Sequence, residues 1–296
     1  MKSGYSAALQ LRARHRRQYA AMSPDPAAEL ARFIAEHPRL TVLSGAGCST
    51  ASGIPEYRDD AGAWKHPRPV QYADFVGSET VRRRYWARSF AGWQRVAGAS
   101  PNSAHRALAR LEQAGILDTL VTQNVDNLHR RAGSRAVIDL HGVLDRVRCL
   151  GCGEITPRAE LQQRLAELNP ERAAGAASFG PDGDAEVQGA LADFIVPSCE
   201  ACGGVLKPDV VFFGESVPRD RVECATDSLR RARALLVVGS SLMVFSGYRF
   251  ARQAHAARQP IAILNRGRTR ADELAALRLA GDCGSVLAEA AGLLAG

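Results

Sequence analysis

The order of apolar and polar positions along the chain predicts strands that alternate with helices. Short, continuously apolar runs predict strands buried on both faces, and they lie at 40–43, 117–121, 136–140, 234–238 and 261–264. Apolar residues at helical spacing predict helices at 27–37, 79–96, 103–114, 220–232, 247–258 and 285–294. Asp25 and Pro26 supply an N-cap and a first-turn proline for the first of them. This alternation predicts an α/β fold with a doubly wound parallel sheet.

Two stretches interrupt the alternation. Residues 146–204 begin and end near a C-x-x-C pair, and within them residues 171–190 are rich in Gly, Ala, Asp and Pro, which predicts a mobile loop. Residues at about 60–100 form a second interruption with a helical pattern. We therefore expect a small inserted module at 146–204 and a helical insertion at 60–100.

The cysteine spacing predicts a metal site. Four of the seven cysteines form the pairs Cys149-x-x-Cys152 and Cys199-x-x-Cys202. Four thiolates suit one structural Zn²⁺ in a closed tetrahedral site, with no open position for water. A redox dithiol pair is the alternative.

Composition and charge narrow the function classes. The chain has 296 residues, of which 46% are hydrophobic, and no apolar run approaches the ~20 residues that span a bilayer. Of the formal net charge of +7, five basic residues lie within residues 1–24, which contain no acidic residue. The extension 1–26 is either a solvated bacterial terminus or a mitochondrial targeting peptide. We expect no nucleic-acid or membrane partner, and a location in the bacterial cytoplasm or alternatively in the mitochondrial matrix.

A glycine turn follows the first predicted strand. In Gly45-Ala46-Gly47 the backbone can approach a pyrophosphate at a helix N-terminus. Thr50 stands where the dinucleotide-binding pattern has a third glycine. A tight turn that requires small residues therefore remains an alternative.

Polar residues follow two more predicted strands. Gln123, Asn124 and Asp126 come after the strand at 117–121, and His141 comes after the strand at 136–140. The carboxyl ends of strands are where α/β folds bind ligands. An amide and a carboxylate can bind a carboxamide there, and a histidine can accept a proton at neutral pH. A capped helix start and a structural histidine are the alternatives.

Six motifs, in this order around the cysteine pairs, resemble the sirtuin family of NAD-dependent protein deacylases. They are Gly45–Arg58, Thr122–His129, Leu140–Gly142, Pro208–Glu215, Gly239–Ser241 and Asn265–Gly267. Three further stretches most resemble class II of the family: Arg84–Arg88, Pro181–Asp184 and Ser246–Phe250. Class II is the subclass of the fourth, mitochondrial human sirtuin and its bacterial relatives. Tyr57 departs from the family pattern, which has phenylalanine before the arginine.

The resemblance implies a Rossmann-like NAD-binding domain at 27–145 and 205–296, with a zinc-binding module at 146–204. It implies that His141 is the general base and that Asn124 and Asp126 line the nicotinamide pocket. The other NAD-binding residues that it implies are Gly45, Ala46, Gly47, Ser49, Tyr57, Arg58, Gln123, Val125, Gly239, Ser240, Ser241, Asn265, Arg266, Gly267 and Cys283.

The resemblance also implies a segment that clamps an acyl-lysine peptide, with the residues Val211, Phe213, Gly214 and Glu215. A buried strand is the alternative for this segment. Tyr85 and Arg88 match a Tyr-x-x-Arg pair that recognises acidic acyl groups, although a solvated helix face would have the same spacing.

The expected activity is NAD-dependent deacylation of lysine in proteins or peptides by a monomer. NAD is cleaved to nicotinamide, and the acyl group passes from lysine to ADP-ribose. A protein mono-ADP-ribosyltransferase on the same scaffold is one alternative. A zinc-module interaction or nucleic-acid-binding protein that has lost catalysis is another.

Overall fold

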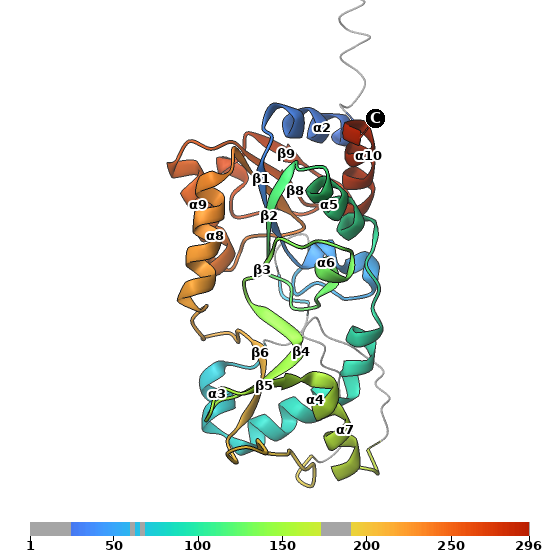
Figure 1. Ribbon diagram of the computed structural model, residues 1–296, viewed down its shortest axis with the longest axis vertical. Helices are drawn as coiled ribbons and strands as arrows, with labels where there is room; N and C mark the ends of the chain where they lie inside the picture. Colours follow the sequence, from blue (N-terminus) through green and yellow to red (C-terminus); the bar gives the residue numbers. More distant parts are fainter. Residues whose placement is uncertain (1–24, 60–62, 66–68, 173–190, 296) are drawn as a thin grey trace, which may run out of the picture.

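The structure of the protein is a computed structural model that describes residues 25–59, 63–65, 69–172 and 191–295 (Figure 1). The basic residues 1–24, the Pro181–Asp184 motif and residues 173–190 of the expected loop lie outside these ranges. Within the ranges, no helix combines the length and the apolar character needed to cross a membrane.

Six strands form a large sheet in the order β3-β2-β1-β7-β8-β9, and all neighbouring pairs are parallel. The strands are β1 (Leu40–Ser44), β2 (Leu117–Thr122), β3 (Val137–Asp139), β7 (Ala234–Val238), β8 (Ile261–Leu264) and β9 (Leu277–Leu279). The strands β1, β2 and β3 form one half of the sheet, and β7, β8 and β9 form the other half. This order confirms the expected Rossmann-like, doubly wound sheet, and it puts the topological switch point between β1 and β7.

Helices cover both faces of this sheet (Figure 1). On one face lie α2 (Pro26–Glu36), α5 (Ser103–Gln113) and α10 (Cys283–Ala295), and on the other lie α8 (Arg219–Arg231) and α9 (Phe245–Ala256). Val42 and Leu236 belong to the core with the first group, and Leu43 and Val237 belong to the core with the second. Successive residues of a strand point to opposite faces, so an unbroken apolar run supplies both cores.

A smaller antiparallel sheet in the order β5-β4-β6 lies in the lower part of Figure 1. Its strands are β4 (Gly142–Cys149), β5 (Ile155–Pro157) and β6 (Leu206–Val210). The helices around it are α3 (Tyr72–Gly77), α4 (Glu79–Gly98) and α7 (Arg158–Leu168), so the stretch expected to be a helical insertion does contain helices. The small sheet extends beyond residues 146–204 at both ends, because it needs β4 and β6 in full.

The remaining elements are short. They are the 3₁₀ helices η1 (Ala46–Cys48), η2 (Thr50–Ser52) and η3 (Asp272–Leu274), and the helix α6 (Leu128–Arg131). Both η1 and η2 follow β1 directly, and α6 follows the loop after β2. The elements η1, η2 and α6 therefore lie at the carboxyl edge of the large sheet, whereas η3 precedes β9.

Candidate functional site

A cavity of about 610 Å³ opens at the carboxyl ends of β1, β2 and β7. Its wall includes the loops that follow these strands and also Leu144 of β4 and Val210 of β6, so both sheets contribute to it. The volume lies in the range of pockets that hold cofactors and small substrates. The cavity is therefore the candidate site, and it lies at the topological switch point.

Close contact between the loops after β1 and β7 explains the glycines at the switch point. The N–H of Gly45 donates to Val238 O at 2.9 Å, and the N–H of Gly47 donates to Gly239 O at 2.8 Å. A Cβ on Gly45 would lie 2.7 Å from Ser240 Cβ, which is closer than real contacts allow. Gly239 has a φ of +61°, a conformation that favours glycine. The glycines thus let the two loops meet at the floor of the cavity.

Replacing Gly45 with alanine should therefore destabilise the fold and weaken NAD binding together. We expect the free energy of unfolding to fall by about 1–3 kcal/mol, the usual cost of overpacking. Urea unfolding and calorimetric titration with NAD measure the two effects. Gly98→Ala is the control, because apart from its chain neighbours and the backbone of its own helix no described atom lies within 4 Å of a Cβ at that position. Unchanged stability and unchanged affinity in Gly45→Ala would contradict the close-contact argument.

Asn124, Ser49 and Asp126 form a hydrogen-bonded chain beside the glycine turn. Asn124 Nδ2 donates to Gly45 O and to Ser49 Oγ, both at 3.0 Å, and Ser49 Oγ donates to Asp126 Oδ2 at 2.6 Å. Asp126 Oδ1 also accepts the N–H of Leu128, the first residue of α6. Asn124 lines the cavity, whereas Ser49 and Asp126 lie behind its wall. Burial raises the pKa of Asp126. Direct contacts of Ser49 and Asp126 with a ligand stay a prediction.

His141 lies in the cavity wall with both ring nitrogens in hydrogen bonds. Nδ1 is 3.0 Å from Gln123 O, and Nε2 is 2.8 Å from Ser246 Oγ. Burial lowers the pKa of His141 to about 4; the Gln123 carbonyl opposes this, and the charges of Arg221 and Arg249 add to it. The imidazole is therefore neutral at pH 7. A carbonyl only accepts, so Nδ1 carries the hydrogen and Nε2 holds the lone pair. The neutral ring can accept a proton at Nε2 when that lone pair is not taken by Ser246.

The cavity wall contains all but two of the residues expected to bind NAD, the exceptions being Ser49 and Asp126. Tyr57 and Arg58 lie at the wall beside Trp64, with the Arg58 guanidinium 4.0 Å from the centre of the Trp64 ring. Asn265 Nδ2 donates to Gly267 O at 2.9 Å, so this side chain holds its own loop. Which of these residues contact NAD stays a prediction.

The residues expected to bind the substrate also reach the cavity, except for Arg88. Val211, Phe213, Gly214, Glu215 and Tyr85 lie in its wall. The N–H of Val211 donates to His141 O at 2.8 Å, which joins this segment to the base. Tyr85 packs against aromatic rings, which are Phe75, Trp86 and Phe212. Arg88 is absent from the described wall, so joint recognition of an acyl carboxylate by Tyr85 and Arg88 stays a prediction.

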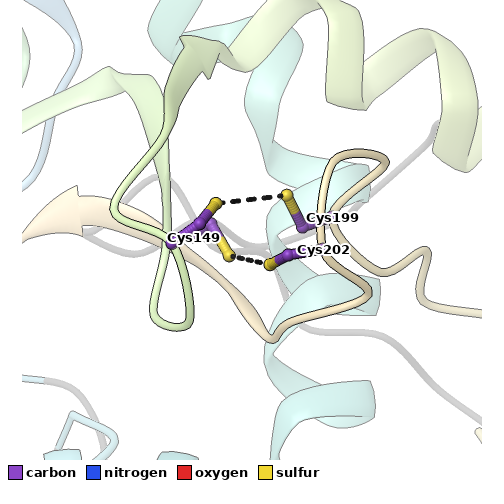
Figure 2. Close-up of side chains that lie close together, drawn as sticks. Cys149, Cys199 and Cys202 are labelled. Carbon is purple, nitrogen blue, oxygen red and sulfur yellow. Dashed lines mark hydrogen bonds between the residues drawn. The ribbon is translucent and has the colours of Figure 1, made fainter.

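The four cysteines meet at the end of the small sheet, and Figure 2 shows Cys149, Cys199 and Cys202 converging from two loops. The four sulfur atoms, with Cys152 as the fourth, lie within 4.8 Å of one another. Cys149 and Cys202 are 3.4 Å apart, and Cys152 and Cys199 are 3.8 Å apart. Tetrahedral Zn²⁺ with bonds of about 2.3 Å needs sulfurs about 3.8 Å apart. The N–H groups of Cys152 and Gly151 lower the pKa of Cys149 to about 6. The distances between the four sulfur atoms therefore fit a tetrahedral zinc ion.

Two further cavity residues lie in the class II-like stretch Ser246–Phe250, but the sequence predicted no role for them in the site. Ser246 and Arg249 lie one turn apart on α9, and both line the cavity. Ser246 bonds to a histidine 105 positions earlier in the chain. A contact over such a separation follows from the packing of α9 against the loop after β2, and no local pattern predicts it.

Known proteins resemble this chain in sequence and in structure. Residues 45–246 match the Sir2 family. The chain is 58% identical to NAD-dependent protein deacetylase 2 of Bradyrhizobium diazoefficiens, over 86% of this chain and 94% of that protein. It is 51% identical to the human NAD-dependent protein lipoamidase sirtuin-4, mitochondrial, over 90% of this chain and 86% of that protein.

A solved structure described as "Sir2-p53 peptide-NAD+" superposes with a TM-score of 0.71 at 29% identity, over 88% of this chain and 94% of that chain. The expected resemblance to the fourth human sirtuin and to bacterial relatives is confirmed. The sequence match, the doubly wound sheet and the cysteine cluster all lead to one assignment: the chain belongs to the Sir2 family.

Proposed function

We propose that the protein is an NAD-dependent protein lysine deacylase, which cleaves NAD to nicotinamide and transfers the acyl group to ADP-ribose. The observation that carries this proposal is the neutral imidazole of His141, in the wall of the cavity at the switch point of the sheet. A relative with 58% identity is named an NAD-dependent protein deacetylase, and a similar structure is described as a complex with a peptide and NAD.

The first step takes place between the two substrates, the acyl-lysine and NAD. The amide oxygen of the acyl-lysine attacks the anomeric carbon of the nicotinamide ribose, and the C–N bond to nicotinamide breaks with its electron pair going to nicotinamide. His141 Nε2 then takes a proton from the ribose diol, whose oxygen attacks the adduct carbon. Water completes the reaction and yields free lysine and O-acyl-ADP-ribose. The only step that this mechanism assigns to His141 follows the loss of nicotinamide.

Zinc has a structural role in this proposal. Cys149, Cys152, Cys199 and Cys202 would hold it as thiolates, and it supplies a closed four-coordinate centre that fixes the two loops. The cluster contains only cysteine ligands among the described residues, so it leaves no position for a reacting water. The monomeric state and the bacterial cytoplasmic location, with the mitochondrial matrix as alternative, remain predictions.

The test is nicotinamide release against a panel of acyl-lysine peptides, including dicarboxyl and lipoyl forms. We expect release that depends on the acyl group, with each peptide losing the mass of its acyl group. A target that gains the mass of ADP-ribose would instead favour the mono-ADP-ribosyltransferase. No nicotinamide release with any peptide or protein would reject both enzymes.

The pH dependence of the reaction follows from the state of His141. Only the neutral imidazole accepts a proton, and a pKa of about 4 keeps it neutral well below pH 7. We expect kcat/KM for deacylation to stay level from pH 8 down to about pH 5 and to fall below that, since kcat/KM reports groups of the free enzyme. An unperturbed histidine would halve the rate near pH ~6.5 instead. A midpoint at 6.5 would contradict a buried, neutral base.

A further inference from the structure

Arg249 brings to the cavity wall a positive charge that forms no ion pair with any described residue. Its side chain is half-buried, and its Nε is buried without a hydrogen-bond partner. The guanidinium lies over the ring of Phe245, 5.4 Å from its centre. The carboxylates of the wall have other partners: Glu56 pairs with Lys65, Glu215 with Lys207 and Asp282 with Arg266, and Asp59 accepts the N–H of Ala63. Arg249 can therefore take a carboxylate from a ligand.

The charges around Arg249 also favour an anionic ligand. Both Arg249 and Arg221 lower the pKa of His141 through their charge, so both lie near the base. Arg221 is 3.9 Å from Asp209, and that carboxylate also pairs with two arginines of β4 at 3.1 and 3.0 Å. Asp139, the next nearest carboxylate, pairs with a further arginine at 3.0 Å. Positive charge is thus in excess here, and it attracts a negatively charged group toward Arg249.

The position of Arg249 on α9 indicates which ligand meets it. Phe245 and Arg249 are four residues apart, so they share a face of the helix. Phe245 and the preceding Val244 are 50% and 39% exposed and line the cavity, which puts this face at the cavity mouth. Gly247 is on the opposite face, against the side chain of Gln123. Arg249 therefore points away from this NAD-site loop and toward the mouth, where a protein substrate enters.

We propose that Arg249 binds an acidic side chain of the protein substrate, close to the acyl-lysine in the sequence of that substrate. The inference rests on the proposed function, since it concerns the substrate of the same site. A guanidinium can bind a carboxylate through two parallel N–H groups. The exposed side chains of Val244 and Phe245 offer apolar surface to the same segment of the substrate. The enzyme then prefers lysines that have Asp or Glu within a few residues.

Paired acyl-lysine peptides test this assignment. The two peptides of a pair carry the same acyl group and differ by glutamate against glutamine at one position, from three residues before the lysine to three after it. We expect the wild-type kcat/KM at pH 8 to be about fivefold higher for the glutamate peptide at one or more positions, near the upper end for a partly exposed ion pair. Arg249→Gln should bring this ratio close to one, and Arg249→Glu should bring it below one.

Arg252→Gln is the matched control. Arg252 lies on the same helix and is exposed, and it is absent from the described cavity wall, so the variant removes the same charge at a different place. Its ratio of kcat/KM values should equal that of the wild type. Added salt should lower the wild-type ratio, because mobile ions screen exposed charges.

Three results would overturn the proposal. The first is a ratio of one in the wild type at every position, or a ratio that Arg249→Gln leaves unchanged. The second is a loss in Arg249→Gln that is confined to dicarboxyl acyl groups, which would place the acyl end at Arg249. The third is a KM for NAD that rises alike with every peptide, which would place a phosphate there. In each case wild-type turnover leaves the proposed function standing. Absence of nicotinamide release with every peptide would reject the proposed function, and this inference with it.

Discussion

Replacing His141 with alanine should abolish transfer of the acyl group while the protein stays folded. Removing a general base costs about 10²–10⁴-fold in rate, and no other described side chain bonds to both Gln123 O and Ser246 Oγ in its place. His141 belongs to no strand or helix and lies at the cavity wall, so we expect its loss to leave the unfolding transition close to that of the wild type. Product formation by mass spectrometry and thermal unfolding measure the two expectations.

His37→Ala is the matched control, since His37 ends α2 and, among the described residues, its ring bonds to Phe33 O of that helix at 2.8 Å. Its turnover should equal that of the wild type. Product formation by His141→Ala at the wild-type rate would remove this histidine from the mechanism. Loss of its folded state would mean that the side chain is structural.

Replacing Cys152 with serine should unfold the end of the small sheet and lower activity indirectly. Folding of small zinc modules depends on the metal, and the cysteine loops here hold β4 next to β6. We expect a fall in Tm of about 10 °C or more, together with less than one bound zinc per chain. Metal analysis and thermal unfolding measure this, and a chelator should give the wild-type protein the same lowered Tm.

Cys224 provides the control for this variant. It is an exposed cysteine on α8, outside the four-sulfur cluster, so Cys224→Ser should keep both the zinc and the wild-type Tm. A wild-type Tm in Cys152→Ser, or a wild-type protein that contains no zinc, would contradict the structural role of the metal.

Five of the six strands of the large sheet, all except β9, are predicted from local sequence, because their apolar runs can be recognised without knowing the partner strand. The run 234–238 is apolar throughout and matches β7, and all five of its residues are buried. Strand β6 gives no such signal, since it contains Lys207, Pro208 and Asp209, and all three are buried. The charges of Lys207 and Asp209 are compensated by residues outside the strand. Glu215 lies 3.0 Å from Lys207, and arginines of β4 form ion pairs with Asp209. Local pattern cannot show such compensation, so β6 is missed.

The candidate site also contains some features that the sequence predicts and others that it does not. Residues that directly follow strands, such as Asn124 and His141, are predictable, because the carboxyl edge of a parallel sheet gathers them. The contacts of these residues are not predictable: the carboxylate of Asp126, for example, accepts from Ser49 Oγ and from the N–H of Leu128. Ser246 reaches His141 only once α9 has packed on Gln123. Chain order thus predicts which residues approach the cavity, while packing decides what each of them does there.

The position of the base in the chain has a mechanical consequence. His141 stands between the last residue of β3, Asp139, and the first residue of β4, Gly142, so it occupies the hinge-like crossing from one sheet to the other. Its own carbonyl also accepts from Val211, just beyond β6. The loop that carries the imidazole is therefore joined to both sheets and to the segment after β6, so any shift of one sheet against the other would act directly on the base.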